Sequence, residues 1–82
     1  MKLIGGRRDG REFPREKGGE VIFACRCLDG KTPPAWAVFA WNCGFLEPIA
    51  VYKSRTRAEQ LTDSLTKAYT SGAETFEVPD ED

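Results

Sequence analysis

Apolar residues form three short runs in the middle of the chain, and turn-forming residues separate the runs. The runs cover residues 20–28, 36–41 and 49–53, and they are rich in the β-branched and aromatic side chains that favour strands. Asp29-Gly30 and Asn42-Cys43-Gly44 mark the two turns between them. Because glycine adopts the positive φ angles that tight turns need, this pattern predicts a three-stranded antiparallel meander.

The apolar period changes to that of a helix after residue 56. One stripe of side chains recurs at helical spacing and consists of Ala58, Leu61, Leu65, Ala68 and Tyr69. Thr56 precedes Glu59 by three residues, which is the capping-box pattern of a helix N-terminus. Gly72 suits the position just beyond a helix C-terminus. We therefore expect a helix over residues 57–71, with its apolar stripe against the sheet.

Shorter elements are predicted at both ends of the chain. Asp9-Gly10 is a turn signal, so residues 2–13 are expected to form a small hairpin. Residues 75–78 alternate between polar and apolar positions, which is typical of an edge strand. The expected fold class is α+β, an antiparallel sheet with one helix packed on one face. We assign residues 1–79 to a single domain and residues 80–82 to an acidic tail.

The alternation along the strands assigns side chains to two faces of the sheet. A turn centred near residues 31–32 predicts that Phe23 lies opposite Trp41 and that Cys25 lies opposite Phe39. The helix would then cover a fully apolar face, made of Val21, Phe23, Cys25, Cys27, Phe39, Trp41, Ile49 and Val51. The second face would consist of Ile22, Ala24, Arg26, Leu28, Trp36, Val38, Ala40 and Tyr52.

This second face is also apolar, whereas a solvated sheet face normally alternates to polar residues. A large exposed apolar surface on a small domain is typical of an interaction site. Three alternatives stay open. The N-terminal hairpin or the tail covers the face, the face is a nucleic-acid platform, or the register differs by one residue, which would exchange the two faces.

Charge is unevenly distributed, although the formal net charge is only −1. Residues 1–31 hold eight Lys or Arg and five Asp or Glu, whereas residues 73–82 hold five acids and no base. The acidic end aids solubility, folds over the basic part or repels nucleic acid. The basic part also suggests an alternative function, a nucleic-acid-binding module in which Arg7, Arg8, Arg11 and Arg55 contact phosphates.

The side-chain inventory offers little for catalysis. The chain has no histidine, so the usual general base at neutral pH is missing, and no nucleophile motif is present. Cys25, Cys27 and Cys43 supply three thiols, one ligand short of a structural zinc site, and are expected to be small buried hydrophobes. We therefore expect no catalytic residue, no metal and no cofactor. With no apolar run of roughly 20 residues and an odd number of cysteines, we expect a cytoplasmic protein without a membrane partner.

The opening L-I-G-G-R-R-D-G-R, from Leu3 to Arg11, resembles the start of many small phage-encoded proteins. These begin with a strand, the pattern G-G-x-x-D-G and a second strand; Arg7 stands where we expect proline. The resemblance implies a phage or prophage accessory protein in a bacterial host cell. Such proteins are often non-enzymatic, and some inhibit host defence nucleases or RNA polymerase. The motif is a turn signal, so it transfers no functional residues.

These patterns together predict a non-enzymatic protein-binding module, and the resemblance implies a phage-encoded inhibitor or modulator of a host protein. Its partner would be another protein or a second copy of the chain. The predicted contact residues lie on the second sheet face and are Trp36, Tyr52, Arg26, Val38, Ile22 and Leu28. Tryptophan, tyrosine and arginine are the residues most often found at interaction hot spots.

Overall fold

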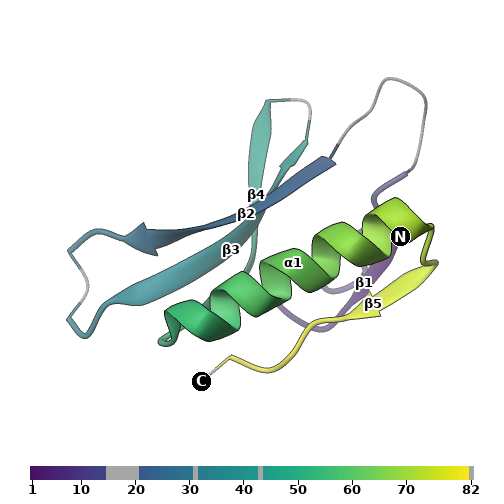
Figure 1. Cartoon of the computed structure of the whole chain (residues 1–82). Coiled ribbons are helices and arrows are strands. Elements are labelled where there is room, and N and C mark those ends of the chain that lie inside the picture. Colours follow the sequence, from purple (N-terminus) through teal and green to yellow (C-terminus); the bar gives the residue numbers. More distant parts are fainter. Residues whose placement is uncertain (15–20, 31, 43, 82) are drawn as a thin grey trace.

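The computed structural model describes residues 1–14, 21–30, 32–42 and 44–81. In chain order its elements are β1 (Lys2–Ile4), β2 (Val21–Leu28), β3 (Ala35–Asn42), β4 (Phe45–Tyr52), α1 (Arg55–Ser71) and β5 (Thr75–Glu77). Strands β2, β3 and β4 form an antiparallel sheet in that order, and β1 pairs with β5 in parallel (Figure 1). The predicted α+β class and the three-stranded meander are confirmed.

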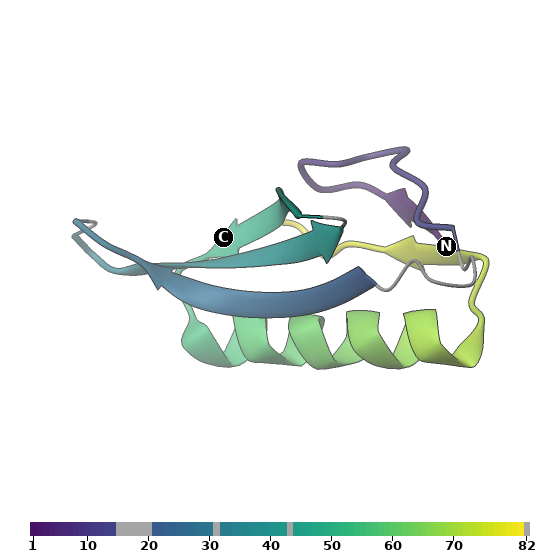
Figure 2. The same cartoon turned by 90° about the horizontal axis from the view of Figure 1, so that it is seen from above.

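The helix lies along one face of the sheet and leaves the opposite face without a helix (Figure 2). It packs mainly against β2 and β3 and presents Ala58, Leu61 and Leu65 to them, as its apolar stripe predicts. The core lies between the two layers and continues under β1 and β5. Its largest fully buried side chains are Tyr52, Phe13, Leu3, Ile49, Leu65 and Val38.

The predicted pairing of β2 with β3 is wrong by one residue. Phe23 pairs with Ala40 rather than with Trp41, and Cys25 pairs with Val38. The faces of β2 are as predicted, but those of β3 are exchanged. The exchange directs Val38 and Ala40 toward the helix and the bulkier Trp41 away from it. Small side chains under α1 allow the close packing between helix and sheet that a dense core requires.

Strand β4 is longer than the predicted strand over residues 49–53. Asn42 pairs directly with Phe45, so only two residues form the turn, and Gly44 has the positive φ of +84° that such a turn needs. The register shifts between Val38 and Phe39 and leaves Ile49 as an extra, fully buried residue on β4. Pro48 is tolerated beside this irregularity because β4 lies at an edge of the sheet.

The helix begins two residues earlier than predicted. Ser54, not Thr56, is the N-cap, and its side-chain oxygen accepts a hydrogen bond of 3.3 Å from the backbone N–H of Arg57. Ser54 has the extended backbone of an N-cap residue, whereas Thr56 already lies in the first helical turn. The C-terminal end is as predicted, with Gly72 beyond Ser71.

The N-terminal segment turns back on itself, as the hairpin prediction requires. The N–H of Leu3 donates to the carbonyl of Arg11 at 2.9 Å, and the N–H of Gly10 donates to the carbonyl of Leu3 at 2.8 Å. The other side of β1 pairs in parallel with β5, from Lys2 opposite Thr75 to Ile4 opposite Glu77. The strand prediction for residues 75–78 is therefore met, in a pairing that local pattern did not indicate. Residues 15–20, which hold some of the basic residues of the N-terminal part, and Cys43, one of the three thiols, lie outside the described residues.

Candidate functional site

The face of the sheet opposite α1, called the open face below, is built from alternate residues of three strands. These residues are Ile22, Ala24, Arg26, Leu28, Ala35, Ala37, Phe39, Trp41, Leu46, Pro48 and Val51. Ten of the eleven are apolar or proline, and Arg26 is the one charged member. Among the described residues, Arg26 forms no hydrogen bond or ion pair, so its guanidinium is available to a partner.

The exposed apolar side chains concentrate at the end of the open face near the β3–β4 turn. Ile22, Trp41 and Leu46 pair across the three strands, and they are 57%, 44% and 48% exposed. We call these three residues the apolar end. They are three of the five large apolar side chains that are exposed in the described chain. The other two are Ile4 on β1 and Phe45, which is 72% exposed at the turn but pairs with Asn42 and so points to the other face of the sheet.

The N-terminal hairpin does not cover the apolar end. The hairpin turn instead follows the outer edge of β4, where the N–H of Arg7 donates to the carbonyl of Ile49 at 2.8 Å. Arg11, on the return of the hairpin, binds Glu47 of β4. These contacts hold the hairpin beside the sheet, which leaves Ile22, Trp41 and Leu46 exposed.

The predicted contact residues divide between the two faces. Ile22, Arg26 and Leu28 lie on the open face as predicted. Trp36, Val38 and Tyr52 lie on the helix-covered face, because the register of β3 differs by one residue. Val38 is 0% and Tyr52 is 1% exposed, so neither reaches a partner while the domain is folded.

The helix start and the C-terminal segment hold the two displaced aromatic residues. The guanidinium carbon of Arg55 lies 5.2 Å from the centre of the Trp36 ring, and that of Arg57 lies 4.7 Å from the centre of the Tyr52 ring. The hydroxyl of Tyr52 donates to the carbonyl of Pro79 at 2.7 Å. Trp36 and Tyr52 therefore serve the packing of the domain.

Trp41, Phe39 and Leu46 take the places on the open face that the sequence assigned to Trp36, Val38 and Tyr52. The signal that identifies them is the two-residue turn before Phe45. If Asn42 and Phe45 are paired across that turn, Trp41 falls opposite Leu46 on one face of the hairpin.

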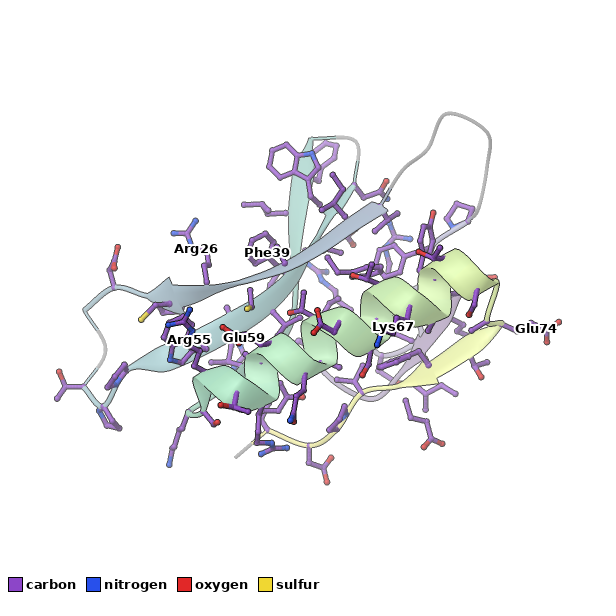
Figure 3. The ribbon with its side chains drawn as sticks, viewed as in Figure 1. Arg26, Phe39, Arg55, Glu59, Lys67 and Glu74 are labelled. Carbon is purple, nitrogen blue, oxygen red and sulfur yellow. The ribbon has the colours of Figure 1, made fainter. Side chains whose placement is uncertain are left out.

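The arginines of the nucleic-acid alternative are largely neutralised by neighbouring acids. Arg7 binds both carboxylate oxygens of Glu81, at 2.9 and 3.0 Å. Arg55 lies 2.6 Å from Glu59, one helical turn later (Figure 3). Only Arg8, of the four arginines named, has no ion pair within the described chain. The acidic C-terminal end thus reaches the basic N-terminal part, which is one of the roles considered for it.

Arg11 and Glu47 form the most enclosed of these ion pairs. Both oxygens of Glu47 accept from the Arg11 guanidinium, at 2.7 and 3.1 Å, and the Glu47 side chain is only 14% exposed. The hydrogen bonds from Arg11 lower the pKa of Glu47, and the positive charges of Arg11 and Arg8 add to this effect against the opposing effect of burial. Glu47 therefore stays ionised and ties the hairpin to β4.

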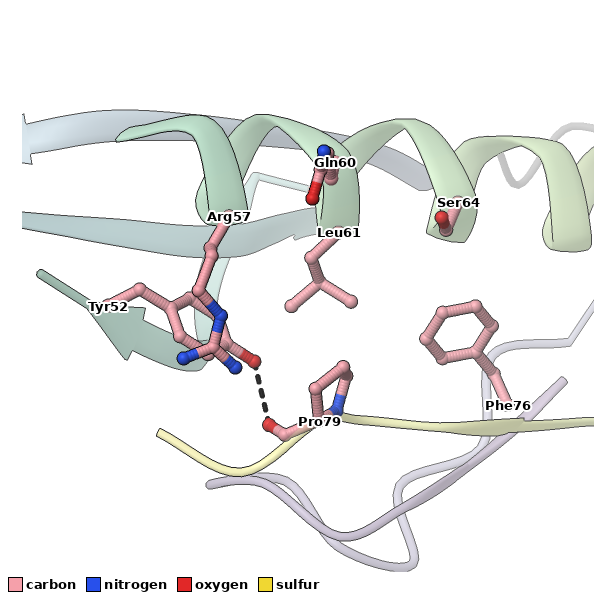
Figure 4. Close-up of a pocket in the computed structure, with 7 residues that line it drawn as sticks. All are labelled: Tyr52, Arg57, Gln60, Leu61, Ser64, Phe76 and Pro79. Carbon is pink, nitrogen blue, oxygen red and sulfur yellow. Dashed lines mark hydrogen bonds between the residues drawn. The ribbon is translucent and has the colours of Figure 1, made fainter. Parts of the chain in front are cut away.

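A cleft of about 230 Å³ lies on the other side of the domain, between α1 and the C-terminal segment (Figure 4). Its lining residues are Tyr52, Arg57, Gln60, Leu61, Ser64, Phe76 and Pro79. Arg57 is already engaged there, because it stacks on Tyr52 and donates to the carbonyl of Asp80 at 3.0 Å. The cleft belongs to the seam that holds the C-terminal segment on the helix.

The described residues bring no three Cys, Asp or Glu side chains together as metal ligands. Cys25 and Cys27 are free and half-buried on the helix-covered face. No helix in the described part of the chain is long and apolar enough to cross a membrane. Comparison of the chain with protein-family models, with curated proteins and with solved structures returned no match.

Proposed function

We propose that this chain is a non-enzymatic protein-binding domain whose contact surface is the open face. The observation that supports this proposal is the clustering of the exposed side chains of Ile22, Trp41 and Leu46 at one end of that face. Small monomeric domains rarely leave large apolar side chains exposed side by side, because each adds surface that water solvates poorly. Contact with another protein would remove this surface from water.

Arg26 gives the surface a specific polar feature. It lies on β2, two rows from Ile22, in a face that offers no carboxylate of its own. A partner carboxylate placed beside Arg26 would form a charge-assisted hydrogen bond inside an apolar contact. We therefore infer that the partner surface is apolar with an acidic residue near its centre.

The test is a quantitative pull-down from bacterial lysate with the double variant Trp41→Ser/Leu46→Ser. Removing two large apolar anchors should reduce capture of a specific partner at least tenfold, equivalent to about 1.4 kcal/mol. Ile4→Ser is the matched control, since Ile4 is 43% exposed but lies on β1, outside the open face. The proposal fails if the double variant captures the same proteins as the wild type, or if the control loses them equally.

Host inhibition, which the phage-like opening implies, stays a hypothesis that the same experiment addresses. A captured bacterial defence or transcription protein would support it. A nucleic-acid-binding role predicts instead an affinity that falls steeply with salt and depends on Arg8, the one of its four candidate arginines without an ion pair in the described chain.

A further inference from the structure

The two outer edges of the three-stranded sheet differ in how they are protected. Strand β4 carries Pro48, the extra residue Ile49 and a hydrogen bond from Arg7 to the Ile49 carbonyl. Each of these features interferes with the addition of another strand. The edge of β4 is therefore closed.

Strand β2 carries none of these features. Its eight residues, VIFACRCL, run in regular register with β3, and they contain no proline, glycine or lysine. Figure 2 shows β2 at the near edge of the sheet. In the described chain, β3 is the only strand paired with it. Its outward-directed N–H and C=O groups therefore present an unprotected template for another strand.

We propose that the outer edge of β2 pairs antiparallel with β2 of a second copy of this chain, about a twofold axis at Cys25. Two three-stranded sheets would then join into one sheet of six strands. This inference concerns the strand edge and does not depend on the proposed function of the open face.

The residues of β2 are self-complementary in this register. Residues opposite one another in an antiparallel pair share a face, so positions whose numbers sum to 50 are opposed. Ile22 then meets Leu28 of the second copy on the open face, and Phe23 meets Cys27 on the helix-covered face. Ala24 meets Arg26, so the two copies of Arg26 are kept apart. The 57% exposure of Ile22 would fall, because an apolar neighbour would cover it.

The helix flank nearest this edge carries the Arg55–Glu59 ion pair at one end, Tyr69 at the other and small side chains between them. Tyr69 contacts Phe23 of β2 at a ring distance of 5.8 Å, whereas the opposite flank, with Arg57 and Ser64, lines the cleft with the C-terminal segment. Helical spacing puts Thr62 and Thr66 on the Tyr69 side. Their hydroxyls donate to backbone carbonyls of their own helix, at 2.8 and 3.0 Å. The two small, internally satisfied threonines therefore suit the approach of a second helix at about 8–10 Å between axes in the middle of this flank, and the Arg55–Glu59 pair stays at its end.

The experiment measures the dimer dissociation constant by sedimentation equilibrium, from micromolar to millimolar protein, for the wild type and two opposite variants of Ala24. Ala24→Lys puts like charges opposite each other at two symmetric places and should weaken the dimer about fivefold. Ala24→Glu puts a carboxylate opposite Arg26 and should strengthen it by a similar factor. Pro48→Lys and Pro48→Glu are controls on the same face but on β4, and neither should change the constant.

A wild type that remains a monomer of 9.2 kDa at every concentration would overturn the proposal. So would a shift of both Ala24 variants in the same direction, or an equal response of the Pro48 controls, which would indicate contact through the open face itself. Hydrogen exchange of the wild type provides a check that needs no variant. The amides of β2 should become more protected as concentration rises, and unchanged protection there would also contradict the proposal.

Discussion

At the scale of single residues, Glu47 shows how one ion pair positions a segment. Its carboxylate binds Arg11 of the N-terminal hairpin, and Arg11 in turn lies 4.7 Å from the centre of the buried Phe13 ring. Because the Glu47 side chain is largely enclosed, its charge is screened less than that of the exposed Arg7–Glu81 pair. Arg11 therefore fastens the hairpin to β4 through its side chain.

The lowered pKa of Glu47 predicts a pH dependence of stability. A carboxyl whose pKa is lower in the folded state stabilises the fold above its unfolded pKa, and this contribution is lost as pH falls through the folded pKa. Glu47→Gln should therefore lower the free energy of unfolding at neutral pH by about 0.5–1 kcal/mol. The difference from the wild type should vanish below the ordinary glutamate range, as measured by urea denaturation at several pH values.

Arg11→Gln provides the second half of a double-mutant cycle for this pair. The double variant should lose less unfolding free energy than the sum of the losses of the two single variants, because either change removes the same interaction. Additive losses, or a difference between Glu47→Gln and wild type that persists in acid, would show that the ion pair does not stabilise the hairpin.

At the scale of elements, α1 begins after Ser54, which no periodic pattern in the sequence identifies as the N-cap. Ser54 and Thr56 are both plausible N-caps, and Thr56 has the better capping-box partner in Glu59. The chain leaves β4 at Tyr52, and Ser54 is the residue whose extended backbone allows its hydroxyl to reach the N–H of Arg57. The end of the preceding strand thus decides which residue caps the helix.

Alanine substitutions distinguish the two caps. Ser54→Ala should reduce the free energy of unfolding by about 1 kcal/mol, because the hydrogen bond to the Arg57 N–H is lost. Thr56→Ala, already inside the helix, should change it by less than about 0.5 kcal/mol. Thermal denaturation followed by circular dichroism measures both. A larger loss of unfolding free energy for Thr56→Ala than for Ser54→Ala would show that Thr56 is the N-cap.

At the scale of the whole molecule, the N-terminal turn, β4 and the C-terminal segment meet at one point. Gly6 lies there with a positive φ of +75°, and a Cβ at this position would lie 2.8 Å from the Ile49 carbonyl oxygen and 2.9 Å from Cγ1 of Val78. The parallel pairing of β1 with β5 brings these distant segments together. Close backbone approach at Gly6 is therefore part of the fold.

Two glycines with similar φ angles separate local strain from this tertiary contact. Gly10 has a φ of +83°, and a Cβ there would meet nothing within 4 Å. Gly10→Ala should cost about 1 kcal/mol from backbone strain alone. Gly6→Ala should cost about 1–3 kcal/mol more, because the added methyl group collides with β4 and Val78. If urea denaturation shows equal losses of unfolding free energy for the two variants, the N-terminal turn moves away from β4 and Val78 without an energetic cost.

The sequence by itself determined the α+β class, the strand order of the meander, the apolar stripe of the helix and the two faces of β2. These features are local, because a period of two or of 3.6 residues can be read within one segment. It also indicated that one sheet face would be apolar and uncovered by the helix, and Ile22, Arg26 and Leu28 do lie there.

Only the tertiary structure decided which residues of β3 and β4 lie on the open face beside those of β2. Both faces of β3 are apolar, so a slip of one residue leaves the hydrophobic pattern unchanged and the pattern cannot select a register. Packing against α1 selects the register. It buries Val38, Ala40 and Ala50 beneath the helix and leaves the bulky Trp41 exposed on the other face. The same long-range contacts set the parallel β1–β5 pair and the meeting of the N-terminal turn with β4. The open face thus carries Trp41 and Leu46 in place of Trp36 and Tyr52.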